Sequence, residues 1–125
     1  MTHSEGLVAD YIAAYNRFDV AGMTAPLSKD VIFENIQDGV VTLRTEGIEA
    51  LRQQAETALT YFSARNQTIL EIKSVGDTLE VNIAYSAVAA VDFPNGIRKG
   101  ERLNLTGKSV FGFEDHRISR ITDIV

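Results

Sequence analysis

The sequence predicts an α+β fold in which three helices from the N-terminal half of the chain pack on one strongly curved, mainly antiparallel sheet. Two observations predict this architecture. Hydrophobic residues recur mostly at helical spacing up to about residue 62, whereas from Gln67 onward they alternate with polar residues, which is the spacing of a strand. The chain has 125 residues, of which 45% are hydrophobic, and contains no linker or repeat. Residues 1–125 are therefore expected to form a single domain with its own core.

The first helix is predicted over residues 4–17, where large apolar side chains recur every three or four positions. These side chains are Leu7, Val8, Tyr11, Ile12, Tyr15 and Phe18. Thr2 and Glu5 form a capping-box pattern at its start. Asp19 is expected to cap a second, short helix, which Pro26 kinks or ends because proline lacks a backbone donor.

The third helix is expected to have Thr45 as its N-cap and to present one apolar face. The side chains of that face are Ile48, Leu51, Ala55, Leu59 and Phe62. Strands are predicted on both sides of this helix, separated by turns rich in Gly, Pro, Asn and Asp. They span residues 31–36, 41–44, 69–75, 78–92, 101–113 and 117–125.

The composition excludes several classes of function. With a net charge of −5 and a pI near 4.9, the chain lacks the dense Lys and Arg clusters that phosphate contacts need, so nucleic-acid binding is not expected. No apolar run is long enough to span a membrane, and residues 1–11 lack the pattern of a signal peptide. The absence of cysteine excludes disulfides and thiol nucleophiles and suits a cytoplasmic location.

No cofactor or metal ion is implied by the sequence. The chain has two histidines, His3 and His116. They are expected to lie far apart, one in the N-terminal segment and one in a turn. Neither is accompanied by the second group of ligands that a metal site needs.

Three stretches of the chain resemble a known superfamily. Residues 11–19 (YIAAYNRFD) are similar to its first helix and the Asp that starts its second. Residues 29–35 (KDVIFEN) are similar to its entry into the first strand, and residues 46–51 (EGIEAL) to its entry into the third helix. In this order and spacing, over essentially the whole chain, the sequence resembles the NTF2-like superfamily. That superfamily includes nuclear transport factor 2, ketosteroid isomerase, limonene epoxide hydrolase and the SnoaL-like polyketide cyclases.

The resemblance implies a cone-shaped NTF2-like fold, with the sheet wrapped around a pocket that the helices close. Such a pocket suits a small apolar molecule held by a few polar groups. The resemblance also implies a homodimer formed back to back through the outer face of the sheet. The alternation of residues in the strands then predicts which polar side chains point into the cone.

Asp123 is the strongest candidate for a catalytic residue. Its carboxyl group lies in the apolar run Ile121-Thr122-Asp123-Ile124-Val125, where burial would raise its pKa toward the value that suits a general base. The alternative is that Asp123 faces solvent or caps a backbone group. By resemblance, Asp123 matches the basic aspartate of limonene epoxide hydrolase and lies near the acid/base Asp proposed for polyketide cyclases.

Asn35 and Phe33 share one face of the first strand. Asn35 can donate and accept hydrogen bonds, so it is a second catalytic candidate, although an Asn at a strand end also commonly bonds the backbone nearby. By resemblance, Asn35 matches the water-positioning Asn of the epoxide hydrolase and the catalytic Asp of ketosteroid isomerase. Phe33 falls where the hydrolase has a Tyr and is expected to contact substrate.

Tyrosines on the first helix complete the predicted catalytic groups. Tyr11 matches the oxyanion-hole Tyr of the isomerase by resemblance, and Tyr15, one turn later, is expected to contact substrate. The alternative for both is an ordinary core position, since buried tyrosines form such stripes.

The remaining substrate contacts are predicted at Tyr85, in the strand 78–92, and at Ser109 and Phe111, in the strand 101–113. Tyr85 and Ala87 fall where the hydrolase has its Arg and central Asp, so epoxide opening by the same mechanism is not expected. Ser109 falls where the isomerase has a protonated Asp, and a hydroxyl can also donate there.

Two functions remain open at this point. One is an enzyme that moves protons on a small apolar substrate, with Asp123 as base, as an isomerase, cyclase or hydrolase. The other is a non-catalytic ligand-binding or dimerisation module. An open pocket with a desolvated carboxylate would favour the enzyme, whereas a pocket filled by Phe111, Phe113, Tyr61 and Phe62 would favour the module.

Overall fold

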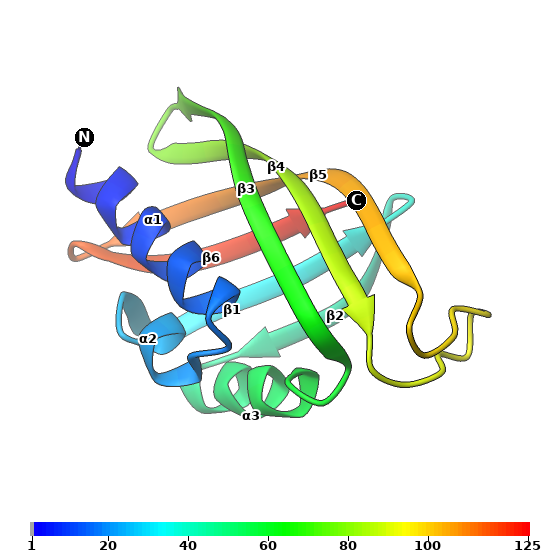
Figure 1. Ribbon diagram of the computed structural model, residues 1–125. Coiled ribbons are helices and arrows are strands. Elements are labelled where there is room, and N and C mark those ends of the chain that lie inside the picture. Colours follow the sequence, from blue (N-terminus) through cyan, green and yellow to red (C-terminus); the bar gives the residue numbers. More distant parts are fainter. Residues whose placement is uncertain (1) are drawn as a thin grey trace.

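The computed structural model describes residues 2–125, which contain three helices and one six-stranded sheet. Figure 1 shows the helices gathered on one side of the sheet, which twists strongly between its first and last strands. The helices are α1 (His3–Asn16), α2 (Val20–Thr24) and α3 (Ile48–Ala58). The strands are β1 (Leu27–Gln37), β2 (Val40–Glu46), β3 (Phe62–Val75), β4 (Thr78–Ala89), β5 (Arg102–Glu114) and β6 (Arg117–Ile124). The predicted α+β fold, with its helices in the N-terminal half and a mainly antiparallel sheet, is confirmed.

The strands lie in the order β2-β1-β6-β5-β4-β3. All neighbouring pairs are antiparallel except β1 and β6, which run parallel. This parallel pair places Asn35 directly opposite Asp123. The last strand thus lies in the middle of the sheet, between β1 and β5, where its side chains are enclosed on both flanks.

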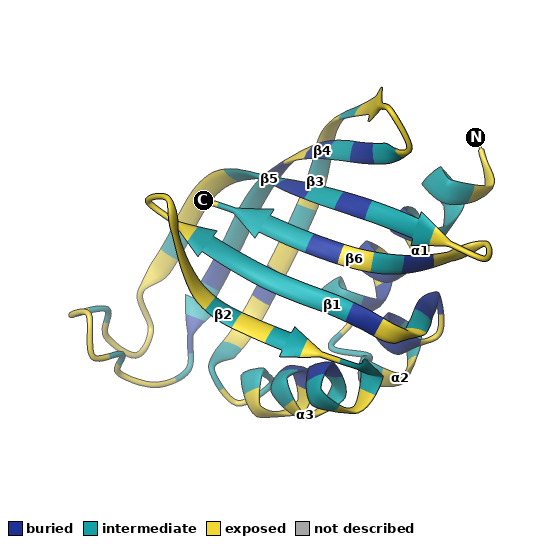
Figure 2. Cartoon of the chain, turned by 180° about the vertical axis from the view of Figure 1, so that it is seen from behind, coloured by how far each residue is buried: buried dark blue, intermediate teal, exposed yellow. Residues whose placement is uncertain are grey.

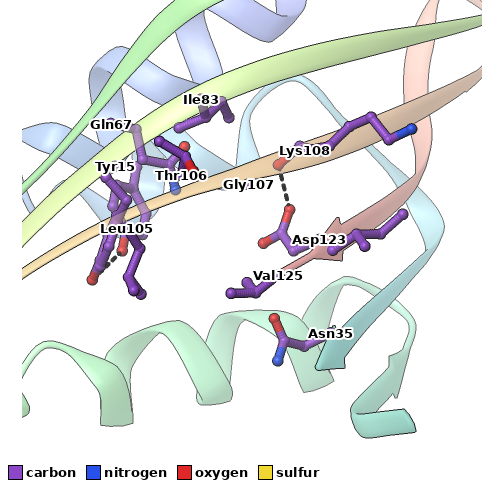
Figure 3. A pocket seen from close by; sticks show the side chains of 13 residues that line it. Tyr15, Asn35, Gln67, Ile83, Leu105, Thr106, Gly107, Lys108, Asp123 and Val125 are labelled. Atoms are coloured by element: carbon purple, nitrogen blue, oxygen red, sulfur yellow. Dashed lines mark hydrogen bonds between the residues drawn. The ribbon is translucent and has the colours of Figure 1, made fainter. Parts of the chain in front are cut away.

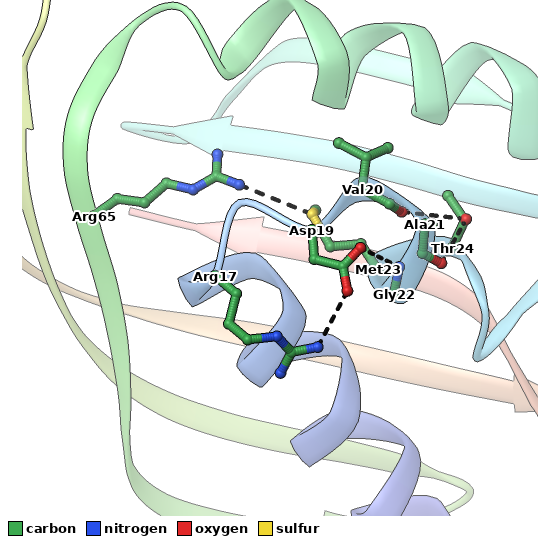
Figure 4. Close-up of polar contacts among 8 residues, drawn as sticks. All are labelled: Arg17, Asp19, Val20, Ala21, Gly22, Met23, Thr24 and Arg65. Atoms are coloured by element: carbon green, nitrogen blue, oxygen red, sulfur yellow. Dashed lines mark hydrogen bonds and ion pairs between the residues drawn. The ribbon is translucent and has the colours of Figure 1, made fainter.

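Local capping explains where the first two helices begin. The Thr2 hydroxyl accepts a hydrogen bond from the backbone N–H of Glu5 at 3.1 Å, as the capping-box pattern predicts. The Asp19 carboxylate accepts one from the N–H of Gly22 at 3.0 Å and starts α2 (Figure 4).

The predicted N-cap of the third helix is wrong. Thr45 belongs to β2, where it pairs with Phe33, and α3 begins only after Gly47. Gly47 has a φ of +88°, a conformation that glycine adopts readily, so the chain turns there without a side-chain cap. Pairing with β1 extends the strand through Thr45, whose buried hydroxyl has no hydrogen-bond partner among residues 2–125.

Two strands begin four or more residues earlier than the sequence predicts, and one ends three residues earlier. β1 begins at Leu27 because this residue already pairs with Ile118 of β6. β3 begins at Phe62, a residue expected on the third helix, because it pairs with Ala89 of β4. The alternation is hard to recognise there, since the inward positions of this segment carry the polar residue Arg65. β4 ends at Ala89 rather than at residue 92.

The core lies between the helices and the concave face of the sheet. Its buried side chains come from every helix and from most of the strands: Val8, Tyr11, Ile12, Met23, Leu27, Val31, Leu51, Val81, Ile83, Phe111, Ile118 and Ile121. Figure 2 shows the opposite face of the sheet, which the helices leave uncovered. Within residues 2–125, no helix has the length and apolar character needed to cross a membrane.

Candidate functional site

A pocket is lined by residues of α1 and of every strand except β2. Its volume is about 230 Å³, below the range of about 300–1,000 Å³ typical of sites for drug-sized ligands, so it suits a small molecule. Both polar and apolar side chains line it: Tyr15, Asn35, Gln67, Ile83, Tyr85, Leu105, Thr106, Gly107, Lys108, Ser109, Asp123, Ile124 and Val125 (Figure 3). Most of these residues carry polar side chains, and Ile83, Leu105, Ile124 and Val125 supply the apolar surface.

Asp123 is the only carboxylic acid among the described residues that line this pocket. The Ser109 hydroxyl on β5 donates a hydrogen bond to Asp123 Oδ1 at 2.6 Å (Figure 3). No Lys or Arg nitrogen lies within ion-pair distance of the carboxylate in the part of the chain that the structure describes. The carboxyl group therefore has one neutral donor and no counter-charge.

Burial raises the pKa of Asp123 to about 6, although the Ser109 hydrogen bond favours the charged form and lowers it. The raised pKa agrees with the sequence prediction. Near neutral pH this group can accept a proton and also return one, because both of its protonation states are accessible. The arrangement suits a general acid or base.

Asn35 reaches the same pocket from β1, opposite Asp123. Its side-chain N–H donates to the Thr42 hydroxyl at 2.8 Å, and that hydroxyl donates back to the Asn35 backbone carbonyl at 3.3 Å. These bonds fix the amide across the β1–β2 pair. Within residues 2–125 no donor bonds the side-chain oxygen of Asn35, so this oxygen is available as an acceptor.

The other predicted catalytic residue, Tyr11, does not line the pocket. It is buried in the core, where its ring packs edge to face on Phe111 with 6.0 Å between centroids. Its pKa lies well above the usual value, first because of burial and then because of the negative charge of Asp123, while Arg65 acts in the opposite direction. Tyr11 is therefore a core residue that lies close enough to Asp123 and Arg65 for their charges to affect its pKa.

Two predicted substrate contacts also lie elsewhere. Phe111 is buried in the core, and Phe33 packs against that core from β1. Neither lines the pocket. Alternation along a strand places both on the inner face, but it does not distinguish the closed end of the cone from its open end.

Tyr15 and Tyr85 line the pocket as predicted and form a pair. The Tyr15 hydroxyl donates to the Tyr85 hydroxyl at 3.3 Å. Burial raises the pKa of both phenols, so both stay protonated near neutral pH. In Figure 3 Tyr15 lies well apart from Asp123, so the pocket carries a phenol pair and a carboxyl group at separate places.

Gln67 is a lining residue that the sequence analysis missed. Its backbone is held at two points by the Asn16 side chain, which accepts from the Gln67 N–H at 2.7 Å and donates to its carbonyl at 3.0 Å. Extending the alternation back from Ile69 would have placed Gln67 and Arg65 on the inner face. Arg65 is the least exposed charged residue among those described, and it too was missed.

The two histidines lie together, contrary to the prediction that they are far apart. His3 Nε2 lies 3.1 Å from the His116 backbone oxygen, and the two rings meet edge to face at 5.7 Å, because α1 extends to His3 beside the β5–β6 turn. Across residues 2–125 no group of three or more His, Asp or Glu side chains is arranged to hold a metal ion.

Residues 8–121 match the family model described as the SnoaL-like domain. The fold is similar to that of a candidate polyketide cyclase from Xanthomonas campestris pv. campestris, with a TM-score of 0.81, 21% identity, and coverage of 98% of this chain and 90% of that one. It is also similar to an NTF2-like protein of unknown function from Burkholderia pseudomallei, with a TM-score of 0.80, 20% identity and coverage of 98% and 90%.

A third similar structure is an LEH-like epoxide hydrolase from M. tuberculosis, with a TM-score of 0.76, 17% identity, and coverage of 98% of this chain and 81% of that one. At such identities the likeness shows a shared fold, and one fold hosts many reactions. The comparison with curated proteins finds no match.

Proposed function

The chain belongs to the SnoaL-like domain family, and from this premise we propose that it is an enzyme that transfers protons on a small apolar substrate, with Asp123 as the general base. The single observation that carries the proposal is the environment of Asp123. Its carboxyl group is desolvated, lines a pocket, and has a pKa of about 6. Perturbed carboxyl groups in pockets are typical of catalytic sites.

The contacts of each lining residue define its role in this proposal. Asp123 takes a proton from the substrate and returns it, while the Ser109 hydroxyl holds the carboxylate in place through Oδ1. Ile83 and Leu105 supply apolar surface to the substrate. Asn35 Oδ1 and the Tyr85 hydroxyl are the polar groups that would orient it.

The pocket also bears on the alternative of a non-catalytic module. A plug of Phe111, Phe113, Tyr61 and Phe62 would have favoured that alternative, but none of the four lines the pocket. Tyr61 and Phe62 pack instead against Phe93, at centroid distances of 5.9 and 5.7 Å. The open pocket supports ligand binding, and the raised pKa of Asp123 supports catalysis over binding alone.

The reaction type is an isomerisation or cyclisation rather than epoxide opening of the limonene epoxide hydrolase type. The positions that resemble the hydrolase Arg and central Asp are Tyr85 and Ala87, and Ala87 is buried without any polar group. Asp123 thus lacks a second acid to protonate a leaving oxygen. A single carboxyl group suffices to move a proton between two carbons of one substrate.

The test is catalysed exchange of carbon-bound hydrogen. Small cyclic ketones are incubated with the protein in D₂O, and loss of the proton signal next to the carbonyl is followed by NMR. We expect exchange above the buffer rate for at least one ketone, and a loss of about 100-fold or more in Asp123→Asn, since general-base catalysis typically contributes about 10²–10⁴-fold.

Asp30→Asn is the matched control, because Asp30 lies on the same β1–β6 pair but is exposed and outside the pocket. Equal exchange by the wild type and Asp123→Asn would overturn the assignment of the base. No exchange above buffer for any ketone, together with saturable binding of the same ketones, would favour the non-catalytic module.

A further inference from the structure

A buried cation that does not line the pocket has no acidic partner among the described residues. Arg65 projects inward from β3 and is only 6% exposed. No Asp or Glu oxygen lies within 4.0 Å of its guanidinium group among residues 2–125. A buried charge is costly unless other groups stabilise it, so its contacts need an explanation.

Arg65 is held by the C-terminal end of α1. Its Nε donates to the Tyr15 backbone carbonyl at 3.0 Å, which is among the last carbonyls of the helix. Its guanidinium carbon lies 3.8 Å from the centroid of the Tyr15 ring and 4.5 Å from that of Phe18. Both the helix end and the ring faces attract positive charge.

These contacts leave part of the guanidinium without a strong acceptor. Besides Nε, only Nη2 has a partner among the described residues, and that is the Met23 thioether at 3.9 Å (Figure 4). A thioether is a weak acceptor, whereas a guanidinium carries five N–H donors. The positive charge of Arg65 is therefore only partly compensated by the fold.

The charge acts on the pocket through two phenols. Arg65 stacks on Tyr15, whose hydroxyl donates to that of Tyr85, and Tyr85 lines the pocket. The positive charge of Arg65 favours the ionised form of both phenols and counteracts part of the rise in their pKa. Because Tyr15 donates to Tyr85, the Tyr85 proton is free to be donated, and it has no acceptor elsewhere in residues 2–125.

We propose that Arg65 is a positioning residue that makes the Tyr15–Tyr85 pair a binding subsite for a negatively charged oxygen of the ligand, such as a carboxylate. Arg65 fixes the Tyr15 ring, Tyr15 orients the Tyr85 hydroxyl, and Tyr85 donates to the ligand. A hydrogen bond from Tyr85 is strengthened when the acceptor is charged and when Tyr85 itself accepts from Tyr15.

This inference rests on the proposed function, since it names the substrate class of the same pocket: a small apolar molecule with one anionic oxygen. The anionic end would lie at the phenol pair and the apolar part against Ile83 and Leu105. Asp123 lies apart from Tyr15 in Figure 3, so the Asp123 carboxylate and the anionic oxygen of the ligand would occupy different parts of the pocket.

The probes are benzoate and benzyl alcohol, which share a ring and differ in the charge of the oxygen end. Dissociation constants for both are measured at pH 7.5 by NMR titration. We expect the wild type to bind benzoate about 10-fold or more tighter than benzyl alcohol, since hydrogen bonds to charged groups are stronger than those to neutral groups.

Four variants test the Tyr85 hydroxyl and the charge and shape of the Arg65 side chain. Tyr85→Phe and Arg65→Met should each abolish the preference for benzoate. Arg65→Lys should retain the preference but weaken both ligands, because lysine keeps the charge and loses the planar stacking. Arg52→Met, at a partly exposed position on α3 outside the pocket and with the same change in net charge, should leave both constants unchanged.

Two results would overturn the proposal. One is equal affinity of the wild type for the two probes. The other is an unchanged preference in Tyr85→Phe, a variant that keeps the ring and removes only the hydroxyl, so that misfolding is not the explanation. A preference lost in Arg65→Met but kept in Arg65→Lys supports a role of the positive charge rather than of the planar guanidinium group.

Asp123→Asn distinguishes this proposal from the proposed function. It should abolish hydrogen exchange but retain the preference for benzoate. If the wild type catalyses exchange but shows no preference for benzoate, the role of Asp123 is supported and the anionic subsite is overturned. If the wild type prefers benzoate but catalyses no exchange, the anionic subsite is supported and the catalytic role of Asp123 is overturned.

Discussion

The protonation of Asp123 depends on two opposing effects at one carboxyl group. Enclosure by the protein disfavours the charged form, and the Ser109 hydroxyl, at 2.6 Å, favours it. Enclosure prevails, which leaves the pKa at about 6 rather than 3.8. A carboxyl group with a pKa raised in this way lowers the stability of the fold when it is charged, and groups of this kind are common in active sites.

Asp123→Asn should stabilise the fold above pH 6. Between about pH 3.8 and pH 6 the folded protein holds a proton that the unfolded chain releases, so stability falls as pH rises through this range. Above it, the charged carboxylate costs on the order of 2–3 kcal/mol, which the neutral amide avoids. Denaturant unfolding of both proteins at pH 4 and pH 8 measures the difference, which should be larger at pH 8. A less stable variant at both pH values would make Asp123 a structural acceptor.

At the scale of the elements, the site depends on how closely β5 approaches β6. A methyl group at Gly107 would lie 2.8 Å from the Ile124 backbone carbonyl oxygen. That carbonyl lies next to Asp123, and Gly107 lies two residues before Ser109. The absence of a side chain at Gly107 therefore allows the close strand pairing that brings the Ser109 hydroxyl to the carboxylate.

Gly107→Ala should destabilise the protein by about 1–3 kcal/mol, the usual range for overpacking, and weaken ligand binding by moving β6. The contact is with backbone, which cannot turn aside as a side chain can. Thermal unfolding and benzoate titration measure both effects.

Gly6→Ala is the control, because nothing lies within 4 Å of the new methyl group on α1. It should stabilise the helix by up to about 1 kcal/mol. A Gly107→Ala protein as stable as the wild type, with normal binding, would show that β5 and β6 have room to separate.

At the scale of the whole molecule, the helices cover only the concave face of the sheet, and Figure 2 shows the other face open. Small or apolar residues lie there on β4, among them Ala84, Ser86 and Val88. Beside them is a hollow of about 340 Å³, lined mainly by outward-facing residues of β3, β4 and β5. Such a face suits contact with a second copy of the chain better than full exposure to water.

We expect a homodimer through this face, with twice the mass of the 13.7 kDa chain in light scattering at micromolar concentration. Ala84→Glu should produce monomers, because it would bury a charge without a partner on each side of a two-fold interface. Val40→Glu, at an exposed position in the β1–β2 hairpin, should remain dimeric. A wild-type protein that scatters as a monomer would contradict the prediction.

The order of elements and much of the pocket could be predicted because alternation along strands shows which side chains face inward. Asp123, Asn35, Tyr85 and Ser109 were found in this way, and all four line the pocket. The depth of a residue in the cone depends on the twist of the sheet and on which strands are neighbours. No local pattern encodes these features, so alternation predicts Phe33 and Phe111 in the pocket, whereas they lie in the core or against it. Tyr11, predicted by resemblance, lies in the core as well.

Arg65 was missed for a different reason. A charged residue on the inner face interrupts the alternation that identifies a strand, so the predicted strand began only at Ile69. Its burial depends on the carbonyl end of α1 and on two aromatic rings, of Tyr15 and Phe18, that are distant in sequence. Residues of this kind, which contradict local rules and are compensated by tertiary contacts, are expected at functional sites.

The parallel pairing of β1 with β6 has a consequence for folding kinetics. Asn35 and Asp123 become neighbours only when the chain between residues 35 and 123 has been closed into a loop, and the entropy of closing that loop must be lost before their contacts form. We expect folding in milliseconds to seconds, as for proteins rich in distant contacts, with β6 docking after the rate-limiting step. Ile121→Val should then accelerate unfolding and leave the folding rate unchanged in stopped-flow measurements. Because residues of β6 line the pocket, we expect partly folded forms to lack the binding site, and a ligand to slow unfolding without accelerating folding.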